Sequence, residues 1–274
     1  MSAPDDGPKP LGALLKEQLA DLTARMDRSR PPIWPDHPEY PKAPDAEAPV
    51  CARCNGGGYL RRNVQPGHPD FGRPVECPCG LIQGRRMQRI WEHSQVPETM
   101  RGYTLESFAE LTGKHELVSA LRDWQASKRW ALFVGPVGLG KTGLAIALLN
   151  EQIASGSGGL YVVTPSYLAR IRATYKRVEA GEIDETDVLR SAVEAPLLVL
   201  DDLGKVKLTD WGQEKLFTVV DERCSIGRRT IVTSNLDTED GSMEQHLWPA
   251  TWDRIRGQSE VFRLTGSSLR GLRS

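Results

Sequence analysis

The sequence contains no long apolar segment. Nothing in it approaches the roughly 18 uninterrupted apolar residues that a membrane-spanning helix requires. The N-terminus begins Met-Ser-Ala-Pro-Asp-Asp and lacks the basic stretch followed by an apolar stretch that marks a secretory signal. We therefore expect a cytoplasmic protein without a membrane span.

The sequence also lacks a large net charge of either sign. Its 274 residues carry 35 Lys and Arg against 36 Asp and Glu, a formal charge of -1, with 39% hydrophobic and 26% charged residues. This composition is typical of a soluble globular protein of one or two domains. Because the total charge neither supports nor excludes a nucleic-acid partner, only local clusters of charge can indicate one.

Cysteine is scarce, and four of the five cysteines lie in two close pairs, Cys51-x-x-Cys54 and Cys77-x-Cys79. In a cytosolic protein such pairs indicate a metal site rather than disulfides, and four thiolates complete a closed, structural Zn²⁺ site. The single residue between Cys77 and Cys79 is an unusual spacing, so His68 remains an alternative ligand. An iron–sulfur cluster or reduced thiols are the other possibilities.

Three segments follow from the pattern along the chain. Residues 1–49 combine an amphipathic helix with a proline-rich linker, and the helix needs to bury its apolar stripe on this chain or on a partner. Residues 50–95 form the zinc-binding module. Residues 96–274 alternate short apolar strands with helices, and this order predicts an α/β fold with a parallel sheet covered on both faces. The predicted strands lie at 130–134, 160–164, 197–201, 230–234 and 261–264.

A complete phosphate-binding loop follows the first of these strands. Its glycines allow the backbone to approach phosphates, and its N–H groups with the next helix's N-terminus favour anions. Lys141 is expected to reach the β- and γ-phosphates, and the Thr142 hydroxyl to coordinate Mg²⁺. The predicted ATP-binding residues are Gly135, Pro136, Val137, Gly138, Leu139, Gly140, Lys141, Thr142 and Gly143.

Polar side chains end two further predicted strands. The run Leu197-Leu-Val-Leu-Asp201-Asp202 ends in two carboxylates, at the edge where open α/β sheets place their ligands. We expect Asp201 to hold Mg²⁺ and Asp202 to act as general base for the attacking water. Asn235, after the strand 230–234, is a candidate for orienting that water, although an Asn in this position is also a common turn residue.

These motifs, with Trp252-Asp-Arg254-Ile-Arg256 and Arg263-Leu-Thr-Gly-Ser-Ser-Leu-Arg270, resemble the AAA+ ATPases of helicase loaders of the DnaC/DnaI type and their IstB-type relatives. The resemblance spans about residues 100–274 and implies an AAA+ core with a five-stranded parallel sheet. It makes Arg254 an arginine finger acting on a neighbouring subunit, with Arg256 as the alternative, and Arg270 the second-sensor arginine. Asp202 stands where many members of that family have Glu, and we expect a minimal or absent C-terminal helical lid.

The resemblance also implies partners. DnaI-type loaders carry a zinc-binding, helicase-interacting domain before the ATPase, so the N-terminal region is expected to bind a replicative hexameric helicase. Basic and aromatic residues on the predicted helix after the second core strand suit single-stranded DNA, although the same arginines are compatible with a solvated face. The predicted DNA-binding residues are Tyr167, Arg170, Tyr175, Lys176 and Arg177.

The sequence therefore predicts a loader that uses ATP binding and hydrolysis to time the transfer of a replicative helicase to single-stranded DNA. It would self-associate through an ATP site shared between subunits, and its hydrolysis would be slow and dependent on DNA or a partner. Two alternatives remain: an IstB-like transposition helper ATPase that acts on duplex DNA, and a nucleotide-switched adaptor with negligible hydrolysis.

Overall fold

The structure is a computed structural model that describes residues 50–69, 71–127, 129–175 and 184–269. Apart from Val50 and Cys51, these residues belong to one compact unit, Ala52–Ser274. The predicted N-terminal helix and proline-rich linker lie outside the described residues. Among the described residues, no helix is long and apolar enough to span a membrane.

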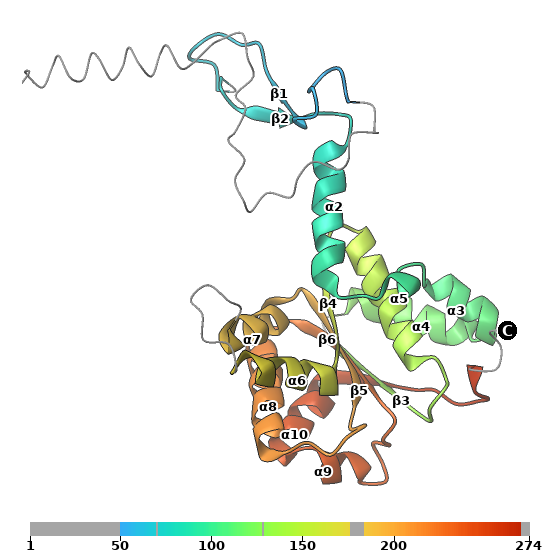
Figure 1. The fold of residues 1–274 in the computed structure, drawn as a ribbon. Helices are drawn as coiled ribbons and strands as arrows, with labels where there is room; N and C mark the ends of the chain where they lie inside the picture. The colour runs from blue at the N-terminus through green and yellow to red at the C-terminus, as the bar shows by residue number, and fades with distance from the viewer. Residues whose placement is uncertain (1–49, 70, 128, 176–183, 270–274) are drawn as a thin grey trace, which may run out of the picture. The chain divides into compact units, whose positions relative to one another are not determined.

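From β3 to β7, each strand is separated from the next by one or two helices, as the sequence predicts for this part of the chain (Figure 1). The N-terminal elements are β1 (Tyr59–Arg61), β2 (Pro74–Glu76), α2 (Leu81–Ser94), the short 3-10 helix η1 (Glu98–Met100), α3 (Leu105–Thr112) and α4 (His115–Ala126). The core elements are β3 (Trp130–Val134), α5 (Lys141–Ala154), β4 (Leu160–Val163), α6 (Thr164–Thr174), α7 (Glu185–Glu194), β5 (Leu197–Leu203), α8 (Asp210–Ser225), β6 (Arg229–Ser234), α9 (Ser242–His246), α10 (Pro249–Gln258) and β7 (Ser259–Arg263).

The core is a five-stranded sheet in the order β4-β5-β6-β3-β7, and all its neighbouring strands run parallel. The phosphate loop follows β3, which lies between β6 and β7. Because the strands are parallel, the loops after β3, β5 and β6 meet at one edge of the sheet. This order brings the three predicted nucleotide motifs together.

Helices cover both faces of the sheet (Figure 1). Alternate residues of β3 serve the two faces: Ala131 and Phe133 join the cluster that contains α3, α4 and α5, whereas Trp130, Leu132 and Val134 join the cluster that contains α6, α7, α8 and α10. All five residues are buried. Burial on both sides explains why the predicted strands are continuous apolar runs rather than alternating ones.

Arg223 of α8 is fully buried in the second cluster. Its Nη1 atom donates to the carbonyls of Ala192, Val193 and Ala195 at 2.6–2.8 Å, and Nε donates to Thr230 Oγ1 at 2.9 Å. The side chain thus satisfies carbonyls at the C-terminus of α7, where a positive charge is favourable. Burial lowers the pKa of Arg223 to about 9, so the guanidinium stays charged at neutral pH. It joins α7 to the start of β6.

Candidate nucleotide site and cysteine cluster

The phosphate loop lies between β3 and α5, as predicted. Gly135, Gly138 and Gly140 have φ values of 139°, 92° and 84°, in the region that favours glycine. A Cβ atom on Gly135 would lie 2.2 Å from the Leu264 carbonyl oxygen, and one on Gly138 would lie 2.2 Å from Ser268 Oγ. These two positions therefore need glycine both for backbone conformation and for close approach to the segment after β7.

The two functional side chains at the start of α5 already have polar partners. Lys141 Nζ donates to the carbonyls of Gly135 and Pro136 at 2.6 and 2.7 Å, within the loop that is expected to hold phosphates. Thr142 Oγ1 lies 2.9 Å from Asp201 Oδ1 and 3.1 Å from Oδ2. A hydroxyl beside a carboxylate offers the hard oxygen ligands that Mg²⁺ prefers, so Thr142 and Asp201 fit the predicted metal site.

The second carboxylate of β5 has an unusual backbone. Asp202 has a φ of 57°, and the β5–β6 register shifts between Leu200 and Leu203. A positive φ is uncommon outside Gly, although Asn and Asp adopt it more readily than other residues, and such positions cluster at functional sites. Asp202 Oδ2 accepts a hydrogen bond from Lys205 Nζ at 2.7 Å. The sequence did not single out Lys205, which also lines the nucleotide cavity.

A cavity of about 910 Å³ opens beside the phosphate loop. It has a polar side, formed by the loop, Asp202 and Asn235, and a largely apolar side formed by residues of 100–111 and Leu269. Its lining consists of Met100, Gly102, Tyr103, Thr104, Ser107, Phe108, Leu111, Val137, Gly138, Gly140, Lys141, Thr142, Gly143, Asp202, Lys205, Asn235 and Leu269. This division suits a ligand that joins a polyphosphate to an apolar ring system.

The apolar side is held by a residue that the sequence did not single out. Asn150 of α5 donates from Nδ2 to the carbonyls of Met100 and Tyr103, both at 2.9 Å. Asn150 is 7% exposed, so these bonds are shielded from water. The helix that begins at the phosphate loop therefore also fixes the turn that lines the opposite side of the cavity.

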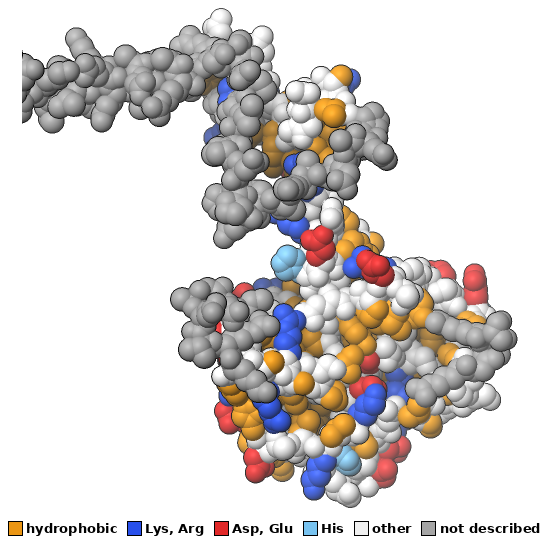
Figure 2. All heavy atoms as spheres, viewed as in Figure 1, with side chains coloured by type: hydrophobic (Ala, Val, Ile, Leu, Met, Phe, Trp, Pro, Cys, Tyr) orange, Lys and Arg blue, Asp and Glu red, His pale blue; other side chains and the backbone are white. Residues whose placement is uncertain are grey.

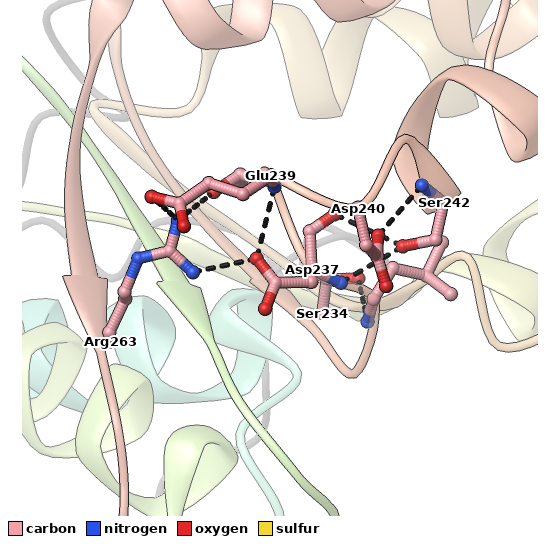
Figure 3. Close-up of polar contacts among 8 residues, drawn as sticks. Ser234, Asp237, Glu239, Asp240, Ser242 and Arg263 are labelled. Carbon is pink, nitrogen blue, oxygen red and sulfur yellow. Dashed lines mark hydrogen bonds and ion pairs between the residues drawn. The ribbon is translucent and has the colours of Figure 1, made fainter.

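The loop after β6 carries Asn235 and is tied to β7 (Figure 3). Arg263 of β7 donates to Asp237 Oδ1 at 2.6 Å and lies 2.7 Å from Glu239 Oε1. The hydrogen bond from Arg263 is the main cause that lowers the pKa of Asp237. At the strand end, Ser234 Oγ donates to the Leu203 carbonyl at 2.7 Å. The predicted sensor residue thus sits between two anchored points.

The predicted arginine finger does not line the cavity of its own chain. Arg254 lies on α10, where its Nε donates to Asp221 Oδ1 of α8 and its guanidinium lies 5.0 Å from the centre of the Phe217 ring. Arg256 is exposed on the same helix. The predicted second-sensor residue, Arg270, lies outside the described residues.

The prediction of a DNA-binding role was wrong for Tyr167. Its side chain is 6% exposed, packs in the core, and places its hydroxyl 3.2 Å from the Val188 carbonyl. Helical spacing points this residue of α6 at the sheet, whereas Arg170 is exposed. Lys176 and Arg177 lie outside the described residues.

Tyr175 instead belongs to a surface cluster with Arg172 and Trp211. Tyr175 is 53% exposed, its hydroxyl accepts from Trp211 Nε1 at 3.1 Å, and the two rings meet edge to face. The Arg172 guanidinium lies 4.7 Å from the Trp211 ring centre. Trp211 is half-buried in the first turn of α8, 36 positions from Tyr175 in the sequence, and only the fold makes the two neighbours. Figure 2 shows charges of both signs interspersed over the visible face.

The four predicted zinc ligands come together. The sulfur atoms of Cys51, Cys54, Cys77 and Cys79 all lie within 4.8 Å of one another, and His68 is not part of this group. The Cys54 and Cys79 sulfurs are 3.8 Å apart. Because Zn–S bonds are about 2.3 Å, two thiolates on a tetrahedral zinc lie about 3.8 Å apart. The donor set and its spacing fit zinc.

The antiparallel pair β1–β2 connects the two halves of this cluster. The Cys77 amide donates to the Gly58 carbonyl at 2.8 Å, and the Gly57 amide donates to the Cys54 carbonyl at 2.8 Å. A Cβ on Gly58 would lie 2.5 Å from Ile82 Cδ1. The 22 residues between Cys54 and Cys77 therefore fold back as a short hairpin, which is why distant cysteines meet.

Comparison with known proteins identifies a family of ATP-binding proteins, in accord with the phosphate loop. Residues 83–274 match the family of IstB-like ATP binding proteins. The chain is 32% identical over 120 residues to an ATP-binding protein of insertion sequence IS1162 from Pseudomonas fluorescens, a match over 44% of this chain and 49% of that relative. It therefore spans about half of that relative's length.

The other relatives include a second insertion-sequence protein and several helicase loaders. The chain is 29% identical to an ATP-binding protein of insertion sequence IS5376 from Geobacillus stearothermophilus, over 72% of this chain and 78% of that protein. It is 24% identical to the replicative helicase loader DnaC of Escherichia coli K12, over 62% of this chain and 70% of that protein.

Solved structures share the fold. A DnaC helicase loader structure superposes with a TM-score of 0.54 at 22% identity, over 62% of this chain and all of that chain. A DnaI structure has a TM-score of 0.52 at 22% identity, over 64% of this chain and 95% of that chain. The five-stranded parallel sheet is thus the AAA+ P-loop core, and the chain belongs to the family of IstB-like ATP-binding proteins.

Proposed function

We propose that this protein is an ATP-dependent loader that binds a replicative DNA helicase and places it on single-stranded DNA. The observation that carries the proposal is the pairing of a family ATPase core with a four-cysteine cluster that precedes it. The DnaC relatives carry helicase loading in their names. The resemblance to DnaI-type loaders supplies the zinc-binding partner module.

The nucleotide site supports ATP hydrolysis. The phosphate loop with Lys141 binds the polyphosphate, and Asp202 accepts the proton of the water that attacks the γ-phosphorus as the bond to the β–γ bridging oxygen breaks. Mg²⁺, held by Thr142 and Asp201, would neutralise phosphate charge. Asn235 orients the water. The short Asp202 side chain, ion-paired with Lys205, favours slow basal turnover.

Single-stranded DNA contact is assigned to the Arg172, Tyr175 and Trp211 cluster together with Arg170. A guanidinium next to one exposed ring, Tyr175, and one half-buried ring, Trp211, offers a phosphate contact and stacking surfaces for bases, a combination that tolerates any base sequence. Stacking on an aromatic side chain stabilises binding by about 1–3 kcal/mol per base.

The alternative function is a transposition helper on duplex DNA. It is favoured by the two insertion-sequence relatives, whose identities of 32% and 29% exceed that of the Escherichia coli loader at 24%. A helper of this kind would assemble on duplex DNA and would not need a helicase. A nucleotide-switched adaptor would bind ATP without measurable hydrolysis.

Co-purification with the replicative helicase tests the loader proposal. We expect the full-length protein to capture the helicase hexamer and to increase its unwinding of single-strand-tailed substrates in the presence of ATP. Lys141→Ala should keep capture and lose ATP-dependent loading. If the wild-type protein fails to bind the helicase and instead forms ATP-dependent assemblies on duplex DNA, the transposition function replaces this proposal.

Binding to a labelled single strand tests the DNA surface. Trp211→Ala should weaken affinity about tenfold, since one stacked base is lost. Trp248→Ala is the control, because Trp248 is a surface tryptophan (37% exposed) that lies outside this cluster, at the N-cap of α10. Equal affinity of Trp211→Ala and the control would remove the cluster from the DNA-binding surface.

A further inference from the structure

Three hydroxyl groups from different elements surround the buried carboxylate of Asp201. The first is the hydroxyl of Thr142 of α5, which the sequence predicts as an Mg²⁺ ligand. Tyr161 of β4 donates from its hydroxyl to Oδ2 at 2.8 Å, and Thr233 of β6 donates to Oδ1 at 2.6 Å. Asp201 is 2% exposed, so these bonds are shielded from competing water. Neither Tyr161 nor Thr233 was singled out by the sequence.

Thr233 contacts both carboxylate residues. Its Oγ1 donates to Asp201 Oδ1 and accepts the backbone N–H of Asp202 at 3.0 Å. A hydroxyl has one donor hydrogen and two lone pairs, so it can make both bonds at once. The N–H of Asp202 is available there because the β5–β6 register breaks between Leu200 and Leu203.

The second bond has a conformational consequence. Asp202 adopts a φ of 57°, in the left-handed region that Asp visits more readily than most residues other than Gly and Asn but that is still uncommon for it. The N–H bond to Thr233 fixes the backbone from which the general base projects into the cavity. Thr233 thus links the side chain of one acid to the backbone of the next.

Tyr161 acts on one acid only. A carboxylate offers only acceptor oxygens, so the Tyr161 hydroxyl is the donor in its 2.8 Å bond to Asp201. Its bond to Oδ2 complements the Thr233 bond to Oδ1. Together they fix the plane of the Asp201 carboxylate against Thr142.

We propose that Thr233 and Tyr161 are positioning residues of the ATP site: Thr233 orients both Asp201 and Asp202, whereas Tyr161 orients Asp201 alone. The inference rests on the proposed ATPase function. The two hydroxyls should therefore differ in what their removal impairs. Loss of the Thr233 hydroxyl should impair Mg²⁺-dependent nucleotide binding and hydrolysis together. Loss of the Tyr161 hydroxyl should impair Mg²⁺-dependent binding more than hydrolysis.

Affinity for a fluorescent ATP analogue, measured with Mg²⁺ and with EDTA, tests the first part. A hydrogen bond to a charged group is worth enough to change an equilibrium about tenfold or more. Thr233→Val and Tyr161→Phe should each reduce the Mg²⁺-dependent gain in affinity about tenfold, with little change in EDTA. Thr233→Ser retains the hydroxyl and should restore the gain.

Steady-state hydrolysis at saturating Mg²⁺ and ATP tests the second part. Thr233→Val should lower kcat at least about tenfold, and Tyr161→Phe should lower it less. Matched controls are Thr251→Val, which alters a buried threonine whose Oγ1 has no hydrogen-bond partner among the described residues, and Tyr167→Phe, which alters a buried tyrosine on α6. Both should behave like the wild type.

The outcomes separate this inference from the proposed function. A wild-type protein that binds no nucleotide would remove the proposed function. A wild-type protein that binds and hydrolyses ATP, with Thr233→Val indistinguishable from Thr251→Val, would overturn the positioning role alone. A Thr233→Ser variant that is as impaired as Thr233→Val would also overturn the positioning role, because the shape of the side chain rather than its hydroxyl would then determine activity. Unfolding midpoints in EDTA identify any variant that fails to fold.

Discussion

Arg254 and Asp221 form an ion pair within one chain, from α10 to α8, and the Arg254 guanidinium also lies over the Phe217 ring. Both charged side chains are 37% exposed. The arginine that the AAA+ resemblance assigns to a neighbouring subunit's nucleotide is therefore held on its own surface. Exposed pairs contribute only about 0–1 kcal/mol, so such a contact can be exchanged for a phosphate at little cost.

Mixing two inactive variants tests a role for Arg254 across subunits. Arg254→Ala should lower stimulated hydrolysis at least about 100-fold, because arginine fingers stabilise charge on the transferring phosphoryl group. Lys141→Ala should be inactive in its own site but can supply Arg254. The mixture should therefore recover part of the activity, measured as phosphate release.

Arg256→Ala is the matched control for this experiment, because Arg256 is exposed on the same helix. Loss of activity in Arg256→Ala, with Arg254→Ala unaffected, would move the finger to Arg256. Failure of the mixed variants to exceed the sum of their separate activities would exclude action in trans.

Replacing the buried Arg223 should destabilise the fold. Arg223→Met leaves the carbonyls of Ala192, Val193 and Ala195 buried without their donor, and breaking such a buried charged network costs about 3–5 kcal/mol. Urea unfolding measures the change in free energy. Arg228→Met, at an exposed neighbouring arginine, should change it by less than about 0.5 kcal/mol. Similar stabilities for the two variants would contradict this account.

The cysteine cluster should bind one zinc ion per chain. Metal analysis of the purified protein is expected to find one equivalent of zinc, and Cys54→Ser should lose it because a closed structural site needs all four thiolates. Chelation should unfold the β1–β2 hairpin while ATP affinity, determined by the separate phosphate loop, is kept.

Cys224→Ser provides the control, since Cys224 lies in α8 and outside the group of four. It should retain a full equivalent of zinc. Iron with visible charge-transfer absorbance, or no metal at all, would contradict the zinc assignment.

The Asp237–Arg263 pair predicts a pH dependence confined to acid. Arg263 lowers the pKa of Asp237 in the folded protein. The pair's contribution to the free energy of unfolding is therefore fully present above the carboxyl's ordinary pKa of about 3.9, and it is lost as the pH falls through the lower pKa of the folded state. Arg263→Met should raise the pKa of Asp237 toward the ordinary value, as measured by NMR of the carboxyl carbon. An unchanged pKa would mean that the loop backbone, rather than Arg263, sets it.

The nucleotide loop and the strands could be predicted from the sequence because their signals are local. The strand at 130–134 has the bounds that the apolar run predicts, since five buried residues in a row leave few alternatives next to a glycine-rich loop. The placement of Asp201, Asp202 and Asn235 at one edge follows from parallel strands. The cysteine grouping followed from residue type and spacing.

Other features depended on which side chains meet in space. Tyr167 and Tyr175 both carry rings at helical spacing, yet only the packing of α6 decides that the first is core and the second exposed. Strand order, which sequence periodicity does not encode, places β4 and β6 on either side of β5 and so brings Tyr161 and Thr233 to Asp201.

The sequence by itself thus determined the chemistry of the phosphate loop, because glycine, lysine and threonine at fixed spacing act through their own backbone and the next helix. Only the tertiary structure decided how the two acids are held and where Arg254 lies. Those contacts join residues 31 to 40 positions apart, and hydrogen bonds of this kind form only after the sheet and helices have assembled.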